Sequence, residues 1–393
     1  MQVSGPATNG NMKYTNKLSC ALVFCISGLI GLFWMHGSQA AASPLPMLAT
    51  SQIIEKRESV GLFQSRAILK TIADSKKHAT VILVPGSGAN GPEEQMPSSV
   101  TLDGKDHSLF EQFSSSLNKA GVNTIQLGKP GIEYFSGWDK STWFYDKALY
   151  QRLQWKDLVD NVKSAIDLAL TLPETDPSRV YILGHSEGTQ VAIDVANVDS
   201  RVKGIVLLGY VGMDLGSILD WQLYRRDIEF FVATDVDANK DGFVDKPEAA
   251  LWSDFEWNWQ TGQDRVSYAE IEAVLRADSR RKAVFDKLES SPLYGNGIFR
   301  RGEMHTLAAS LKQDVFVFNG SVDMQTPASE ATALQAKCQQ LGKANCWVEI
   351  VPGVGHGFSA PRPPKSQPVV DLTIGPASQE FIEILRNFAV QNL

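Results

Sequence analysis

One serine in the chain has the surroundings of a catalytic nucleophile. Ser186 is the centre of the run G-H-S-E-G at 184–188, directly after an apolar, β-rich stretch at 180–183 and directly before a helical pattern. A strand-to-helix turn this sharp forces its central residue into a strained conformation and exposes the hydroxyl at the helix N-terminus. Because Gly-x-Ser-x-Gly also occurs by chance, the prediction depends on this placement between a strand and a helix.

A serine hydroxyl is too weakly acidic to attack unaided, so it needs an imidazole base and an acid that orients the base. Asp323 follows an apolar run at 315–319, and His356 lies in a Gly-rich turn after the run at 347–351. Both side chains are therefore predicted at carboxyl ends of strands, where open α/β sheets assemble their sites.

Each of these two residues has a simpler interpretation. His356 could be a histidine of a surface loop, although glycines on both sides favour close approach to another segment. Asp323 could form or cap the turn in which it stands. In that case Asp214, after the predicted strand at 202–208, is the alternative acid.

Acyl transfer also needs N–H donors for the developing oxyanion, and backbone amides are the expected source. One is the amide of Glu187, which follows the nucleophile. The other is predicted at Ser87, in the Gly-rich turn at 85–88 that follows an apolar run. The alternative for this turn is a phosphate-binding loop, which would need a Gly-Lys-Ser/Thr sequence that is missing here.

These residues resemble the α/β-hydrolases, and among them the bacterial serine hydrolases whose nucleophile motif reads G-H-S-E-G. The run at 81–88 is similar to the oxyanion strand and loop of that group. Its D-K-R-G turn reads G-K-P-G here, at 128–131, so any role of that turn stays open. The resemblance covers roughly residues 58–211 and 310–390.

The resemblance implies a triad of Ser186, Asp323 and His356, and hydrolysis of carboxylic esters through an acyl-enzyme. Two other functions stay open. One is a serine peptidase with the same triad, and the other is a catalytically silent, calcium-dependent binding protein that kept the fold.

The predicted elements form an α/β-hydrolase fold, with a mostly parallel sheet and helices on both faces. The predicted strands are 79–84, 122–127, 180–183, 202–208, 315–319 and 347–351, after a hairpin at about 58–73. The predicted helices are 109–120, 153–171, 189–196, 329–341 and 378–391. The interval between 208 and 315 is far longer than one crossover needs. We therefore expect a core of 50–211 and 309–393, with 212–308 inserted as a mainly helical cap.

The cap contains a second motif, at 237–248, which matches the twelve-residue calcium loop of the EF-hand. Calcium prefers six to eight oxygen ligands. The predicted ligands are Asp237, Asn239, Asp241, the Phe243 carbonyl, Asp245 and Glu248. The alternative is an acidic, solvated loop that binds nothing. Bound calcium would stabilise the cap or regulate it. No organic cofactor is expected.

The pattern partly recurs 22 residues later, with Val266 and Glu270 in place of Val244 and Glu248. Trp259, Thr261 and Gln263 occupy its ligand positions and cannot supply the charge. We interpret it as a degenerate partner loop that binds no metal. Trp252, Trp257 and Trp259 fit a cap core better than an acyl-binding wall.

The N-terminal segment at 1–42 predicts export. Lys13 and Lys17 precede an uncharged run at 18–35 and then small residues, which is the pattern of a signal peptide, although the run is long enough for a retained membrane anchor. Met12 is a second candidate start. We expect a periplasmic or secreted protein that meets a membrane only through such an anchor.

Composition and cysteines agree with export. The 393 residues carry a net charge of -7, which makes nucleic acid an unexpected partner. Cys20 and Cys25 lie in the apolar run, so cleavage would leave Cys338 and Cys346 as a nearby pair. In an oxidising compartment they are predicted to form a disulfide, the alternative being two buried thiols.

Overall fold

The computed structural model describes residues 52–96, 98, 101, 103–133, 143–250, 257, 259–302, 304–359 and 375–393. The N-terminal segment at 1–42 and Trp252 lie outside these ranges. Among the helices that are described, none combines the length and apolar character that crossing a membrane requires.

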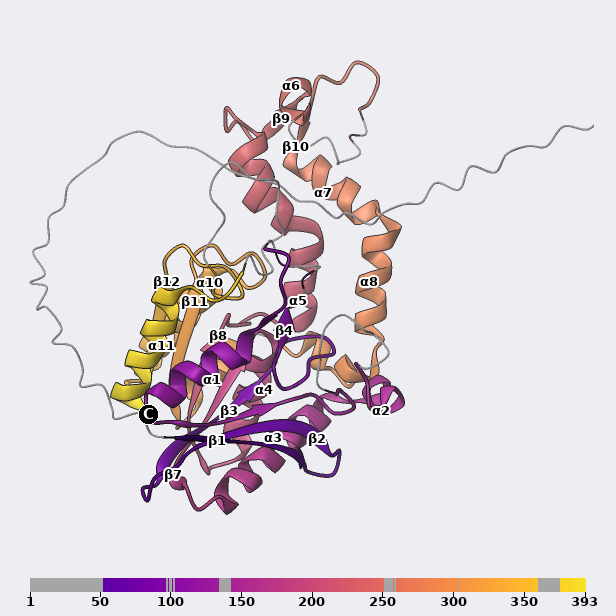
Figure 1. Cartoon of the computed structure of the whole chain (residues 1–393). Coiled ribbons are helices and arrows are strands. Elements are labelled where there is room, and N and C mark those ends of the chain that lie inside the picture. Colours follow the sequence, from indigo (N-terminus) through magenta and orange to yellow (C-terminus); the bar gives the residue numbers. More distant parts are fainter. Residues whose placement is uncertain are drawn as a thin grey trace, which may run out of the picture.

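An eight-stranded sheet forms the centre of the molecule (Figure 1). The first two strands run antiparallel to their neighbours, and all the others are parallel. In spatial order the strands are β1 (Ile53–Val60), β2 (Ser65–Ile72), β6 (Asn123–Leu127), β3 (His78–Val84), β7 (Thr175–His185), β8 (Val202–Leu208), β11 (Asp314–Gly320) and β12 (Cys346–Val351). This order, with a serine in the turn after β7, confirms the predicted α/β-hydrolase fold.

Helices cover both faces of the sheet, as the strand-helix alternation predicts. One face packs against α1 (Leu109–Lys119) and α11 (Gln379–Asn392), whose phenylalanines interlock: the ring centroids of Phe113 and Phe381 are 5.6 Å apart. The other face packs against α3 (Trp155–Thr171), α4 (Glu187–Val198), α9 (Met304–Ser310) and α10 (Ala328–Gln340). Strands buried on both faces explain the continuous apolar runs of the sequence.

Several bounds differ from the predicted elements; for example, the first hairpin begins at Ile53 rather than at about 58. Strand β7 begins at Thr175, ahead of the apolar run at 180–183, because Thr175 pairs with His78 of β3. A short helix, α2 (Lys147–Arg152), precedes α3 and was not predicted. Its N-cap is Asp146, whose side chain accepts a hydrogen bond from the N–H of Leu149 at 2.8 Å.

The segment between β8 and β11 rises from the sheet as a mainly helical arm (Figure 1). Its described elements are α5 (Leu215–Asp220), the π-helical segments η1 (Trp221–Arg225) and η2 (Ile228–Val236), β9 (Phe243–Asp245), α6 (Lys246–Ala249), β10 (Arg265–Ser267), α7 (Tyr268–Ala277), α8 (Ser279–Glu289) and the 3₁₀ turns η4 (Pro292–Tyr294) and η5 (Ile298–Arg300). Residues such as Val232, Val244 and Ile271 form a separate small core at its tip. The π-helical turns were not predictable from apolar spacing.

The predicted disulfide is present. It joins Cys338 of α10 to Cys346, the first residue of β12. The bond ties a helix on one face of the sheet to the strand that follows it.

Candidate active site

Ser186 occupies a strained turn between β7 and α4. Its backbone has φ 54° and ψ −124°, which non-glycine residues rarely adopt, and its N–H donates to the Leu208 carbonyl at 2.9 Å. Both glycines of the motif are required by packing. A Cβ on Gly184 would lie 2.2 Å from the Gly188 carbonyl oxygen, and one on Gly188 would lie 2.2 Å from the Val84 carbonyl oxygen.

Asp323 and His356 form a buried pair at the same edge of the sheet. The two side chains come from the turns after β11 and β12, and Nδ1 of His356 lies 2.9 Å from Oδ2 of Asp323. Asp323 also accepts from the N–H and the hydroxyl of Thr326, each at 2.8 Å. Burial alone would raise the pKa of Asp323, but the adjacent His356 and these donors outweigh it and leave the pKa below its usual value.

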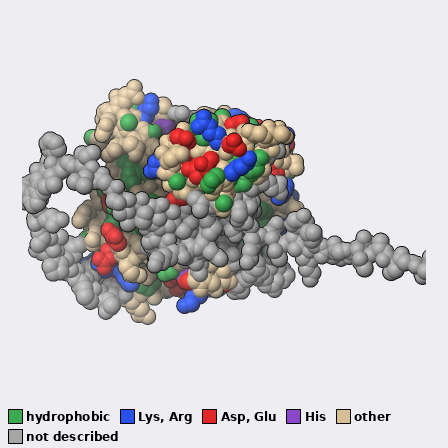
Figure 2. All heavy atoms as spheres, turned by 90° about the horizontal axis from the view of Figure 1, so that it is seen from above, with side chains coloured by type: hydrophobic (Ala, Val, Ile, Leu, Met, Phe, Trp, Pro, Cys, Tyr) green, Lys and Arg blue, Asp and Glu red, His purple; other side chains and the backbone are tan. Residues whose placement is uncertain are grey.

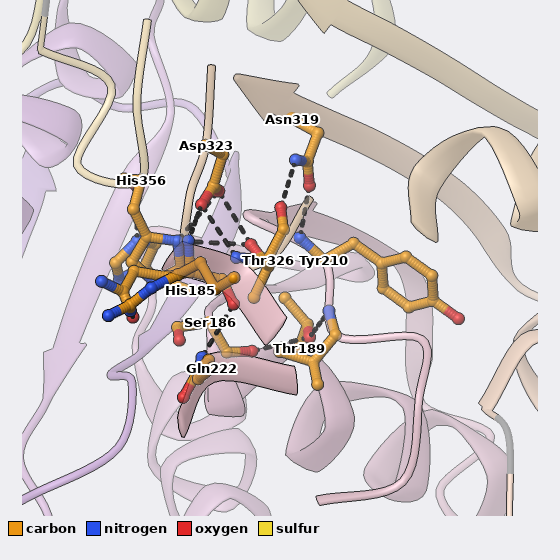
Figure 3. Close-up of polar contacts among 12 residues, drawn as sticks. His185, Ser186, Thr189, Tyr210, Gln222, Asn319, Asp323, Thr326 and His356 are labelled. Carbon is orange, nitrogen blue, oxygen red and sulfur yellow. Dashed lines mark hydrogen bonds and ion pairs between the residues drawn. The ribbon is translucent and has the colours of Figure 1, made fainter. Parts of the chain in front are cut away.

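This arrangement determines how His356 can act. A proton on Nδ1 faces the carboxylate of Asp323, so the Nε2 atom is left to accept a proton. The ring lies against the end of β8, since a Cβ on Gly209 would be 3.1 Å from two of its atoms. Ser186 is hydrogen-bonded to the same end of β8, and Figure 3 shows Ser186, His356 and Asp323 gathered at one point.

Asp214, the alternative acid, has another role in this structure. Its carboxylate caps α5 by accepting from the N–H of Ser217 at 2.9 Å and from the Ser217 hydroxyl at 2.6 Å. The geometry therefore favours Asp323 as the partner of His356.

The loop after β3 lies close to Ser186. A Cβ on Gly86 would lie 3.0 Å from the Ser186 Cβ, so a larger residue there would crowd Ser186. The Asn90 side chain donates to the carbonyls of Gly86 and Ser87, each at 2.9 Å. Because N–H and C=O point in opposite directions across a trans peptide, the N–H of Ser87 is turned away from Asn90.

Two backbone amides are available to an oxyanion. Within the described part of the chain, neither the N–H of Ser87 nor that of Glu187 donates to a protein acceptor. Glu187 is the first residue of α4, so its N–H also has the favourable field of a helix N-terminus.

The side chain of Glu187 belongs to a buried network that sequence reasoning missed. One carboxylate oxygen lies 2.7 Å from Nζ of Lys129, and the other accepts from the hydroxyl of Tyr294. All three side chains are buried, and burial next to Glu187 raises the pKa of Tyr294. The available signal was two charged residues within Gly-rich turns, at 128–131 and 184–188.

His185, the other variable residue of the motif, is also buried and also paired. Its Nδ1 atom lies 3.0 Å from Oε1 of Glu94, a residue of the loop that follows β3. The motif offered a signal for His185 but none for Glu94. Tyr294 comes from the cap, so the segment at 212–308 reaches the residue next to the nucleophile.

The loop at 237–248 is held by hydrogen bonds between its acidic side chains and its own backbone. Asp237 is fully buried and accepts from the N–H of Asp241 at 3.3 Å and of Gly242 at 2.9 Å, while Gly242 has φ +85°. At the other end, Glu248 accepts from the N–H of Ala238 and of Asp245, each at 3.0 Å. The loop is thus closed on itself by its first and twelfth residues.

The predicted calcium ligands are oxygen donors, as calcium requires, but their side chains do not converge in this structure. Among the described residues, no three Asp, Glu, His or Cys side chains are grouped as a metal site would need. Glu248 here caps the start of α6. Seen from above, acidic and basic side chains of the arm lie close together (Figure 2), for example Asp241 and Arg265, 3.8 Å apart.

The second loop pairs with the first, as the sequence pattern suggests. Strands β9 and β10 are antiparallel, with Val244 opposite Val266, and both valines are buried in the core at the tip. Glu270 accepts from the N–H of Ser267 at 2.7 Å and so caps α7. The stacked rings of Trp257 and Trp259 pack against the same core.

Comparisons with known proteins give the following. No protein-family model and no curated protein matches the sequence. Among solved structures, the chain is similar to Est1E from Butyrivibrio proteoclasticus, at 12% sequence identity and a TM-score of 0.44 over 86% of this chain and 96% of that one.

Two further solved structures are similar. A monoacylglycerol lipase from Paleococcus ferrophilus has 13% identity and a TM-score of 0.40 over 86% of this chain and 99% of that one. A puromycin-hydrolyzing peptidase from Mycobacterium tuberculosis has 14% identity and a TM-score of 0.45 over 79% of this chain and 36% of that one. The fold assignment itself rests on the strand order and on the turn at Ser186.

Proposed function

We propose that this chain is an exported serine hydrolase that cleaves carboxylic esters through an acyl-enzyme. The observation that carries the proposal is the meeting of three segments at one edge of the sheet. They are the strained turn at Ser186, the His356–Asp323 pair with Nδ1 and Oδ2 2.9 Å apart, and the Gly86 loop. A nucleophile, an oriented base and oxyanion donors are the three parts that acyl transfer needs.

The proposed reaction has two steps. Ser186 Oγ attacks the ester carbonyl as its proton passes to Nε2 of His356, and the alcohol leaves with that proton. Water then gives a proton to His356 as it attacks the acyl-serine, and His356 returns that proton to Ser186 Oγ as the acid is released. In both steps Asp323 stabilises the imidazolium, and the amides of Ser87 and Glu187 donate to the oxyanion.

Support for an ester rather than a peptide comes from the sequence resemblance alone. An amide has a poorer leaving group than an ester, so a peptidase would have to protonate the leaving nitrogen efficiently. The two substrate classes are therefore separated by a direct comparison of turnover.

The proposal includes calcium in the cap. The donors Asp237, Asn239, Asp241, Asp245, Glu248 and the Phe243 carbonyl would hold the ion. Support comes from the buried first residue of the loop, the left-handed Gly242 and the paired valines of β9 and β10. When bound, calcium would supply charge neutralisation to the loop and stabilise the folded arm.

Export is proposed from the segment at 1–42 and is supported by the disulfide between Cys338 and Cys346, since such bonds persist mainly in oxidising compartments. A periplasmic or secreted location would also provide calcium. The proposed partners are a small ester and calcium, with no nucleic acid, and a membrane only through a retained anchor.

The test uses the purified full chain and a series of acyl esters of increasing chain length, with matched amides. We expect ester hydrolysis, slow amide hydrolysis, and loss of turnover in Ser186→Ala. We also expect an activated phosphonate to label the wild type and not the variant. Comparable turnover of esters and amides would favour the peptidase. The absence of both labelling and turnover would favour the binding protein.

A further inference from the structure

A second carboxylate–imidazole pair lies next to the catalytic one. His185 and Glu94 are each only 1% exposed, and the ring centroids of His185 and His356 are 4.8 Å apart. On one edge of the His185 ring, Nδ1 is 3.0 Å from Oε1 of Glu94. On the other edge, Nε2 is 3.0 Å from the backbone carbonyl oxygen of His356.

The contacts determine where the protons are. A carbonyl oxygen only accepts, so Nε2 of His185 must carry a proton. Oε1 of Glu94 accepts from the N–H of Gly86 at 2.6 Å and faces Nδ1 of His185 at 3.0 Å. The other oxygen, Oε2, is buried without a hydrogen-bond partner among the described residues, so a proton there would have no acceptor. The proton between Oε1 and Nδ1 is assigned to Nδ1, because Glu94 outweighs burial and raises the pKa of His185, and the pair is then an imidazolium and a carboxylate.

The pair connects the two halves of the reaction centre. Glu94 holds the amide of Gly86, which begins the loop expected to donate to the oxyanion. His185 holds the carbonyl of His356, the expected base. Glu94 has a left-handed backbone, with φ 44°, so the loop is strained where this carboxylate enters the site. One ion pair thus sets the distance between base and oxyanion loop.

We propose that Glu94 and His185 are positioning residues for the ester hydrolysis proposed above: their ion pair orients the His356 backbone and the Gly86 loop. The inference rests on the proposed function. The groups facing His185 are Glu94, His356 and Asp323.

The first test is Glu94→Gln, which keeps the shape and the acceptor for Gly86 but removes the charge. His185 would then become neutral, and His356 would lose its positive neighbour. We expect kcat to fall about 10- to 100-fold with KM changed less than about twofold, since misplaced groups mainly affect the transition state.

The second test separates the two contacts of His185. His185→Asn can keep a donor at the Nδ1 position and loses the bond to His356. His185→Gln can keep a donor at the Nε2 position and loses the bond to Glu94. We expect kcat to fall in both variants.

The structure offers a matched control at the opposite edge of the sheet. His78 also bridges a carboxylate and a carbonyl, with Nε2 2.8 Å from Asp74 and Nδ1 2.9 Å from the Gly121 carbonyl oxygen. His78→Asn is the same substitution far from Ser186, but there it keeps a donor for the Gly121 carbonyl and loses the bond to Asp74. We expect wild-type kcat.

An NMR readout is independent of activity. Nitrogen-15 spectra of the wild type near neutral pH should show protons on both ring nitrogens of His185, assigned by their loss in His185→Asn. A single ring proton there would overturn the proposal, and so would wild-type kcat in folded Glu94→Gln. If the wild type itself neither turns over esters nor reacts with a phosphonate, the proposed function has failed, and the spectra still test the ion pair.

Discussion

The corner of the sheet around Ser186 and the loop at 237–248 hold their acidic groups in opposite ways. At the corner, every buried carboxylate named above faces a cationic or imidazole partner from a distant segment. The pairs are Asp323 with His356, Glu94 with His185, and Glu187 with Lys129. In the loop at 237–248, the carboxylates accept mainly from backbone N–H groups of the loop itself.

Positive side chains also neutralise fewer of the acids in the loop at 237–248. In the described part of the chain, no lysine or arginine pairs with Asp237, Asp245 or Glu248, and Arg265 approaches Asp241 only to 3.8 Å. Hydrogen bonds from the Tyr268 hydroxyl and the backbone outweigh burial and lower the pKa of Asp237, which keeps it negative. The corner is therefore neutralised by folding, whereas the loop is left with charge that suits a cation.

The largest effect that would break this comparison is a catalytic one. Asp323→Asn should lower kcat for ester hydrolysis about 10⁴-fold, because an amide no longer holds the Nδ1–H tautomer of His356. Steady-state kinetics on the best ester measures it. Asp214→Asn is the control, since Asp214 caps α5 and should be within about twofold of wild type. If Asp214→Asn lost activity and Asp323→Asn kept it, Asp214 would be the acid that orients His356.

The next effect is on stability and tests compensation at the corner. Lys129→Met keeps the length of the side chain but leaves Glu187 buried without its cation, because both side chains are under 5% exposed. Removing one partner of such a pair costs about 3–5 kcal/mol of unfolding free energy, measured by chemical denaturation.

Lys70→Met is the matched control for that variant. Lys70 is as buried as Lys129, but its partner Glu111 is 48% exposed and can be solvated when the lysine is lost. We expect a clearly smaller loss. Equal losses in the two variants would mean that the burial of Glu187 has no special cost.

The corner and the loop also differ in how far the sequence predicts them. The turn at 184–188 and the loop at 237–248 are contiguous patterns whose residue types have local reasons, so both could be located. The carboxyl-end rule also predicted that Asp323 and His356 would lie at one edge of the sheet, which is where the structure has them.

The partners of the buried pairs could not be predicted. Glu94 lies in an irregular loop, Lys129 in a turn that departs from the family pattern, and Tyr294 in a 3₁₀ turn of the cap. Their contacts depend on long-range packing that no spacing encodes. The predicted calcium site is the opposite case. The loop at 237–248 matches a local pattern, but that match does not by itself bring the carboxylates together.

A smaller effect tests the loop. Calcium at about 100 times its dissociation constant should raise the unfolding free energy of the wild type by about 2.7 kcal/mol, and a chelator should reverse this. Calorimetry with and without calcium measures it. Asp237→Asn should lose the response, whereas Asp264→Asn should keep it, because Asp264 is an exposed acid of the second loop paired with Lys246. A wild type indifferent to calcium would leave the loop as a solvated turn.

The smallest effect sharpens the comparison through pH. Burial lowers the pKa of His185, but Glu94 and the His356 carbonyl outweigh it and leave the pKa above its usual value of about 6.5. The native state therefore keeps a proton that the unfolded state releases, so the stability that this gives is complete below about pH 6.5. It is lost as the pH rises through the folded pKa, by at most about 1.4 kcal/mol per pH unit.

In the loop at 237–248, hydrogen bonds from Tyr268 and the backbone hold the pKa of Asp237 below its usual value, so Asp237 does not contribute to the slope. Denaturant unfolding between pH 6 and 9 should therefore show a decline in the wild type that is smaller in His185→Asn. His78→Asn changes a histidine at the other end of the sheet. This variant should still show the part of the decline in unfolding free energy that His185 causes. Identical slopes of unfolding free energy against pH in wild type and His185→Asn would mean that the corner does not hold an ionised His185. The charge of Glu94 would then be balanced by something other than His185.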